Sequence, residues 1–102
     1  MQAIQVEIFD LLNARKKIQQ MHLAINQPLI LINSPGSIKT LGAVVIDYIF
    51  KTLAKEFVVE KTILRVDEDL AGFFTALELG YTNIMYTGNS VYAKQLLRNL
   101  LT

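Results

Sequence analysis

The chain has 102 residues, enough for one small domain and too few for two. A formal net charge of +1 provides no broad basic surface for nucleic acid, and the lack of cysteine excludes disulfides and thiolate metal sites. Hydrophobic residues make up 52% of the chain, so we expect a packed core and some apolar surface that is buried against a partner.

The amino-terminal sequence M-Q-A-I-Q-V-E-I-F-D has no basic segment followed by an apolar run, so no signal peptide is predicted. The strongest apolar run, 41–50, is too short for a membrane span and contains Asp47, so we expect no membrane association. Together with the absence of cysteine, these features favour a cytoplasmic protein.

Residues 3–25 fit two patterns. Apolar and polar residues alternate over 4–8, as in a half-buried strand, but the apolar positions between 4 and 18 also fit one face of a helix. We favour a strand to about Phe9 and then a helix through Gln20, with one long helix as the alternative.

The next segment predicts a strand, a turn and a long helix. Residues 29–32 are all apolar, as in a strand inside a parallel sheet, and the turn 33–37 ends in Ser37, which is expected to cap a helix. The helix is predicted over 38–57 with Asp47 on a narrow polar stripe. The rest of its circumference is apolar, which predicts a homodimer interface; a helix packed between the sheet and other helices is the alternative.

The stretch from Phe57 to Asn89 predicts a strand, a helix and a second strand. Residues 61–66 are typical of a buried strand, Asp69 is placed to N-cap a helix over 70–79, and Gly80 follows where a positive φ is expected. Residues 83–86 then indicate a second short strand. Strand, helix and strand form a βαβ unit, whose crossover should be right-handed.

A last helix is expected over 91–101, after the turn 87–90. The whole pattern predicts a single α/β domain over 1–102. We expect a small three-layer Rossmann-like fold, with a mostly parallel sheet of three or four strands and helices on both faces.

Ligands of a parallel α/β sheet bind outside the carboxyl ends of its strands. Here those ends carry Asp10 and the segments 33–37, 67–69 and 87–90. Carboxylates, hydroxyls and helix N-termini along one edge suit a hard cation together with an anion such as phosphate. The simpler alternatives are turn and cap roles for the serines and a solvated helix start for 67–69.

The central stretch resembles the haloacid dehalogenase-like (HAD-like) superfamily. Its proteins often carry F-G-V-x-P-E-K-T-L-F-V-D-D, an Ala-rich helix and then A-L-G-Y; this chain has F-V-V-E-K-T-I-L-R-V-D-E-D and later A-L-E-L-G-Y. The resemblance implies that Asp67 and Glu68 hold magnesium. It also makes Ser34 the nearest phosphate ligand, with Asn33 and Gly36 as neighbouring candidates.

The start, I-F-D-L-L-N, resembles the family's nucleophile motif I-F-D-x-D-G-T, which makes Asp10 the candidate nucleophile. Leu12 stands in place of the acid/base aspartate, and Asn13 and Ala14 replace the Gly-Thr that follows. No room is left for a cap domain, so the likeness is to a degenerate, cap-less member. Weaker likenesses are to Clp-type serine peptidases, through L-I-L-I-N-S-P-G-S, and to anti-sigma-antagonist domains.

Two functions follow from these patterns. The first is a non-catalytic HAD-like α/β domain that acts through self-association or a protein partner, because the catalytic set is incomplete and one helix is widely apolar. The alternative is a magnesium-dependent phosphoryl-transfer enzyme with weak or specialised activity, in which Asp10 attacks phosphorus, Ser34 holds the phosphate, and Asp67 and Glu68 hold the metal.

Overall fold

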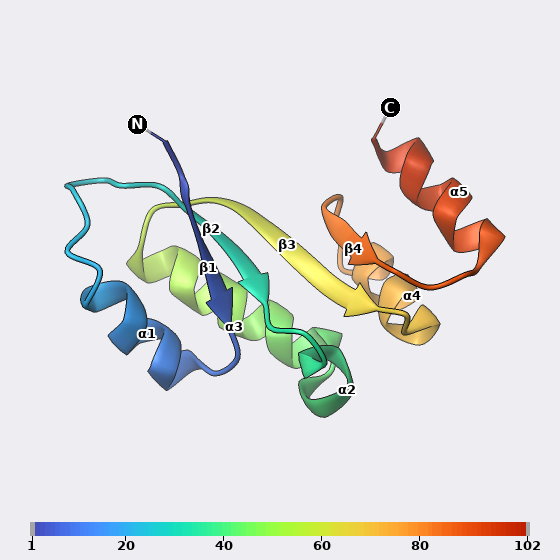
Figure 1. The fold of residues 1–102 in the computed structure, drawn as a ribbon, viewed down its shortest axis with the longest axis horizontal. Coiled ribbons are helices and arrows are strands. Elements are labelled where there is room, and N and C mark those ends of the chain that lie inside the picture. Colours follow the sequence, from blue (N-terminus) through green and yellow to red (C-terminus); the bar gives the residue numbers. More distant parts are fainter. Residues whose placement is uncertain (1, 102) are drawn as a thin grey trace.

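The structure is a computed structural model that describes residues 2–101, and its core is one four-stranded sheet with the strand order β1-β2-β3-β4 (Figure 1). Every neighbouring pair of strands is parallel. In chain order the elements are β1 (Ile4–Ile8), α1 (Leu11–Gln19), β2 (Leu29–Asn33), α2 (Ser37–Leu41), α3 (Ala43–Glu56), β3 (Val59–Asp67), α4 (Leu70–Glu78), β4 (Ile84–Tyr86) and α5 (Val91–Leu100).

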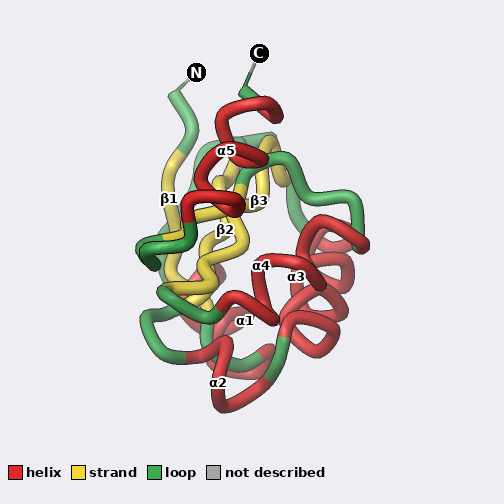
Figure 2. Tube along the Cα trace, turned by 90° about the vertical axis from the view of Figure 1, so that its right-hand side faces the viewer, coloured by secondary structure: helices red, strands yellow, loops and turns green. Residues whose placement is uncertain are grey.

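The strand order decides where the helices lie. Each crossover in a parallel sheet is right-handed, and here every crossover steps the same way along the sheet, so α1, α3 and α4 must all lie on one face. Figure 2 shows these helices on a single side of the strands. The predicted α/β class and parallel sheet are confirmed, but the helices are shared unequally between the two faces.

The helix-covered face holds the hydrophobic core. Strand residues that point to this face pack against the helices, and the fully buried ones include Leu29, Leu31, Leu64 and Val66, with Phe50 of α3 among their partners. None of the helices described in residues 2–101 is long and apolar enough to cross a membrane.

We call the opposite side of the sheet the outer face. Side chains alternate along a strand, so the register places one set of residues on this side. The set is Gln5 and Glu7 of β1, Ile30 and Ile32 of β2, Lys61, Ile63 and Arg65 of β3, and Met85 of β4.

Helix α5 lies beside β4 at one edge of the sheet (Figure 1). Leu97 and Leu101 line a shallow hollow of about 230 Å³ together with Ile63 and Met85, whose side chains belong to the outer face. Helical cover on the outer face is therefore confined to the region of β3 and β4.

Several local signals are confirmed. The first segment is the strand and helix that we favoured, not one long helix. The Asp69 carboxylate accepts a hydrogen bond from the Gly72 N–H at 3.0 Å and so caps α4. Gly80 follows that helix with a φ of 91°. Each of these features depends only on neighbouring residues.

The single helix predicted over 38–57 is wrong, because the structure divides it into α2 and α3 at Gly42. This glycine has φ 84° and ψ 156°, a conformation that a residue with a Cβ rarely adopts. The predicted cap is also wrong by one residue: Gly36 is the N-cap of α2, and Ser37 lies inside the helix and is buried.

The predicted polar stripe on α3 is wrong at Asp47. This residue is only 7% exposed, and its Oδ1 accepts a hydrogen bond from the Tyr81 hydroxyl at 2.6 Å while its Oδ2 pairs with Lys51 at 2.9 Å. The exposed side of α3 is instead largely apolar, with Val44, Val45 and Tyr48 exposed by 63%, 45% and 65%.

Candidate functional site

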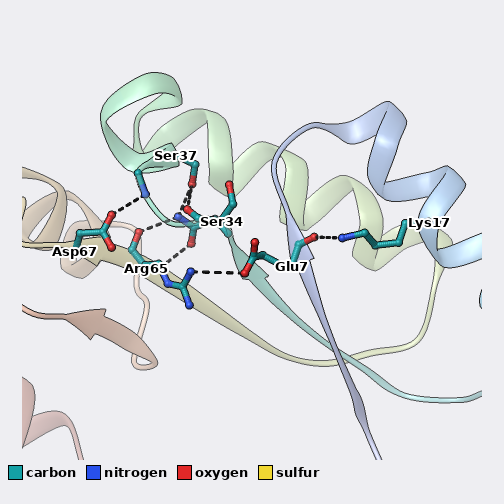
Figure 3. Close-up of polar contacts among 8 residues, drawn as sticks. Glu7, Lys17, Ser34, Ser37, Arg65 and Asp67 are labelled. Atoms are coloured by element: carbon teal, nitrogen blue, oxygen red, sulfur yellow. Dashed lines mark hydrogen bonds and ion pairs between the residues drawn. The ribbon is translucent and has the colours of Figure 1, made fainter.

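The carboxyl ends of the strands form one rim, which is the place that sequence reasoning assigned to a ligand (Figure 3). Asn33, the last residue of β2, is 1% exposed. Its Oδ1 accepts from the Arg65 backbone N–H at 2.6 Å, and its Nδ2 donates to the Arg65 carbonyl at 2.8 Å and to Ser37 Oγ at 2.9 Å. Asn33 therefore joins β2, β3 and α2, and its amide group is fully used by the protein.

Ser37 completes this network. Its hydroxyl donates to the Ser34 carbonyl at 2.7 Å and closes the turn between β2 and α2. The Ser34 backbone N–H donates to the Ile8 carbonyl at 2.8 Å, which holds the turn against β1 as well. The Ser34 side chain is partly exposed beside this network, whereas the side chain of Asn33 is buried.

Asp67 adopts an unusual backbone conformation at the end of β3, with φ at 52°. Aspartate is among the few residues that tolerate this left-handed region. Its Oδ2 accepts a hydrogen bond from the Gly36 N–H at 2.9 Å, and its carbonyl accepts from the Thr87 N–H at 2.7 Å. Asp67 thus links the turns that follow β2, β3 and β4.

The three consecutive acidic residues have separate partners. Asp67 binds Gly36, Asp69 caps α4, and the Glu68 carboxylate pairs with Lys39 at 3.4 Å on an exposed surface. Within residues 2–101, no group of three His, Cys, Asp or Glu side chains is arranged to hold a metal ion. Asp67 and Glu68 are neighbours at the rim, but they gain no third acidic ligand there.

Asp10 lies apart from this acidic turn. Its carboxylate caps α1, accepting from the Asn13 N–H at 2.8 Å and from Asn13 Nδ2 at 2.9 Å. Because β2 lies between β1 and β3, and adjacent strands are about 4.8 Å apart, the strands that lead to Asp10 and Asp67 are roughly 10 Å apart. Asn33, Ser34, Gly36, Asp67 and Glu68 are brought to one rim, and Asp10 stands at its far end.

Arg65 is the rim residue that sequence reasoning missed. Its side chain extends across β2 on the outer face to Glu7 of β1, with Nη1 at 3.8 Å from Oε2 (Figure 3). That distance is too long for a hydrogen bond, and the buried Nη1 has no hydrogen-bond partner. Ile32, which lies on the intervening strand, is 1% exposed because this pair shields it.

An arginine within a segment whose sequence predicts a buried strand was the available signal for this feature, and Glu7 in the first predicted strand was the other. Beside Glu7, a hollow of about 500 Å³ opens between β1, α1 and Ser34, lined also by Lys16 and Lys17. Lys17 Nζ donates to the Glu7 carbonyl at 3.0 Å, which ties α1 to the edge strand.

A second polar cluster lies at the opposite end of the sheet. The hydrogen bond from Tyr81 to Asp47 joins α3 to the loop before β4, beside a hollow of about 360 Å³. Burial raises the pKa of the Tyr81 hydroxyl well above its usual range, and the hydrogen bond to the Asp47 carboxylate raises it further. The hydroxyl therefore stays protonated and acts as a donor that positions the loop.

The fold and its rim define a small α/β domain with an all-parallel sheet, helices on one face and a rim held by side-chain hydrogen bonds. The chain belongs to the family of a Rickettsia prowazekii (strain Madrid E) protein described as uncharacterized protein RP547. The two are 51% identical over 80 residues, which cover 76% of this chain and 74% of the relative. No family model and no solved structure matches the chain.

Proposed function

We propose that this chain is a non-catalytic α/β domain that acts by associating with itself or with another protein. The observation that supports this most strongly is the outer face of the sheet. All-parallel sheets occur almost only with both faces covered, because their strands are apolar on both sides. Here the outer face has no layer of helices above β1 and β2, and Ile30 of β2 is partly exposed there.

The exposed side of α3 adds to this support. Val44, Val45 and Tyr48 lie next to one another on the helix and are turned to solvent. Single exposed apolar residues are normal on protein surfaces, so this group weighs less than an uncovered parallel sheet. It remains the homodimer surface that the sequence predicts, and the second place where a partner would bind.

The hydrogen bonds of the rim favour association over catalysis. Asp10 caps a helix, Asn33 is saturated by Arg65 and Ser37, and Asp67 already accepts a backbone N–H. Groups that maintain the fold in this way are poorly placed to change partners during a reaction. On this proposal, the likeness to the HAD-like superfamily is one of fold and not of catalysis. A cytoplasmic location suits a chain without cysteine.

Sedimentation velocity over a concentration series tests the proposal, together with a phosphatase assay in millimolar magnesium. We expect a concentration-dependent dimer, no hydrolysis of a generic phosphate ester, and no magnesium-dependent rise in the melting temperature. A monomer that hydrolyses the ester, and loses this activity in Asp10→Asn, would overturn the proposal in favour of the phosphoryl-transfer enzyme.

A further inference from the structure

Strand β1 lies at one edge of the sheet, and part of its backbone points away from β2. Consecutive residues of a strand turn their backbone groups to opposite sides, and Ile4 and Ile8 bond to β2. Gln5 and Glu7 therefore direct their N–H and C=O groups outward. Among these four groups, and within residues 2–101, the Glu7 carbonyl alone has a partner, which is Lys17 Nζ at 3.0 Å.

Helix α1 forms the second wall of a groove along this edge. The hollow of about 500 Å³ between β1 and α1 is lined by Glu7 and Phe9 on the strand side and by Asn13, Lys16 and Lys17 on the helix side. A strand that is added to β1 lies about 4.8 Å from it, which places the new backbone along this hollow. The groove is therefore where an extended chain could meet the outward hydrogen-bonding groups of β1.

The charges that face the groove are positive. Helix α1 contains no acidic residue, and its Lys16 and Lys17 line the hollow. Glu7 is the one acidic residue among the described residues of the lining. Its carboxylate points across β2 toward Arg65, while its carbonyl faces Lys17 (Figure 3). An added strand would consequently meet two ammonium groups and the backbone of Glu7, with the carboxylate turned away.

We propose that β1 accepts an extended segment of another protein as a further strand, and that this segment carries acidic side chains at alternate positions. Hydrogen bonds to the backbone of Gln5 and Glu7 would supply affinity. Side chains of an added strand alternate between the two faces, so every second one lies on the side of α1, near Lys16 and Lys17. This inference rests on the proposed function and names the kind of partner that the chain binds.

Lys17 has a defined part in this arrangement. Its ammonium now occupies the Glu7 carbonyl, which is the acceptor that a backbone N–H of an added strand would use. The incoming strand would take over this carbonyl, and the released ammonium would pair with an acidic side chain of the same strand. A charge-assisted contact would then replace one between an ammonium and a neutral carbonyl.

The same lysines disfavour a second copy at this edge. Two copies that join β1 to β1 in one continuous sheet are related by a two-fold axis through the sheet, which sets their α1 helices side by side on one face. Lys16 and Lys17 of one copy would then approach those of the other. Lysine beside an exposed edge strand protects against self-pairing in this way. An acidic strand gains from the charges that repel a copy, so the edge selects a partner of opposite charge.

Two capped synthetic peptides serve as probes, one in which glutamate alternates with threonine and one in which lysine replaces the glutamate. The acidic peptide should bind the full chain, with an affinity that falls as salt is added, and the basic peptide should not bind. Lys16→Glu and Lys17→Glu should each weaken binding at least about tenfold. Lys94→Glu is the matched control, because Lys94 is an exposed lysine on α5 beside the opposite edge strand, and it should leave binding unchanged.

Hydrogen exchange of backbone amides tests strand addition itself. In the free chain, the Gln5 and Glu7 amides should exchange fast, and the Val6 amide, which is directed to β2, should exchange slowly. The acidic peptide should slow the exchange of Gln5 and Glu7. N-methylation of alternate peptide residues should abolish binding for one set of positions and be tolerated for the other set, because only alternate residues of an added strand bond to β1.

This inference is overturned if the acidic peptide does not bind at millimolar concentration, or binds equally with either set of positions methylated. It is also overturned if Gln5 and Glu7 become protected in the chain alone as its concentration rises, because a second copy would then occupy the edge. These results leave the proposed function intact. The proposed function is overturned separately, by a monomer that hydrolyses the phosphate ester and loses this activity in Asp10→Asn.

Discussion

The side chain of Asn33 supplies the backbone of Arg65 with hydrogen bonds at the point where β2 and β3 stop pairing. The Arg65 N–H donates to Asn33 Oδ1 at 2.6 Å, and the Arg65 carbonyl accepts from Nδ2 at 2.8 Å. An asparagine side chain thus extends the sheet by one residue beyond the regular ladder, which ends at Ile32 and Ile63. At the rim, side-chain hydrogen bonds from Asn33 therefore take the place of backbone hydrogen bonds between the two strands.

We predict that Asn33→Ala lowers the free energy of unfolding by about 2–4 kcal/mol. The change leaves the Arg65 N–H and carbonyl unpaired near the core, and each such buried group costs about 1–3 kcal/mol. Urea unfolding measures the loss. Asn89→Ala, in an exposed turn, is the control and should change stability by less than about 0.5 kcal/mol. Equal effects of the two changes would mean that the amide network contributes nothing.

Asp10 should behave as a helix cap. Asp10→Ala removes the acceptor for the Asn13 N–H and is expected to cost about 1 kcal/mol. Asp10→Ser should retain most of the stability, because a serine hydroxyl accepts the same hydrogen bond. Thermal or urea unfolding of the two variants makes the comparison. A serine variant as unstable as the alanine variant would show that the carboxylate has another role.

Gly88→Ala should be destabilising because of a steric conflict with Tyr86. A Cβ on Gly88 would lie 2.3 Å from the Tyr86 hydroxyl oxygen and 2.4 Å from Cζ. Tyr86 packs on Phe73 with ring centroids 5.3 Å apart, and its hydroxyl accepts the Ser90 N–H, so the ring cannot move without loss. We expect a cost of about 1–3 kcal/mol in urea unfolding.

A double variant separates this conflict from a general effect of glycine replacement. Tyr86→Leu removes the hydroxyl and the ring, so Gly88→Ala should cost less in that background than in the wild type. The thermodynamic cycle from four unfolding curves gives the coupling between the two positions. If the losses of unfolding free energy in the two single variants add up in the double variant, the cost of Gly88→Ala comes from the backbone at position 88 and not from a conflict with Tyr86.

The Tyr81 hydroxyl should make stability fall at high pH. Burial, reinforced by the hydrogen bond to Asp47, raises its pKa in the folded state, so the native protein keeps a proton that the unfolded chain releases above about pH 10. This stabilisation is complete below the unfolded pKa and is lost as the pH rises beyond it. Tyr81→Phe should therefore show a shallower decline of unfolding free energy above pH 10.

Urea unfolding between pH 8 and pH 11 provides the measurement for this prediction. Tyr92→Phe is the control, since Tyr92 is 64% exposed, and it should retain the wild-type decline. If Tyr81→Phe and wild type decline in parallel, the Tyr81 hydroxyl ionises equally in the folded and unfolded chains.

Much of the candidate site was accessible from the sequence because parallel strands present their carboxyl ends at one edge. That rule brings Asn33, Ser34, Gly36, Asp67 and Glu68 to a common rim, as the structure places them. It could not determine the order of strands along the edge. Since β2 separates β1 from β3, Asp10 stands away from Asp67, and the rim lacks the compact set of ligands that the sequence resemblance implies.

The sequence by itself determined the features that neighbouring residues control: the apolar strands, the Asp69 cap and the positive φ of Gly80. Only the tertiary structure decided which distant groups meet, such as Asn33 with Arg65 and Asp47 with Tyr81. It also decided that the connecting helices share one face. The reason is physical: hydrophobic periodicity and capping act within a few residues, whereas strand order and side-chain pairing depend on how the whole chain packs.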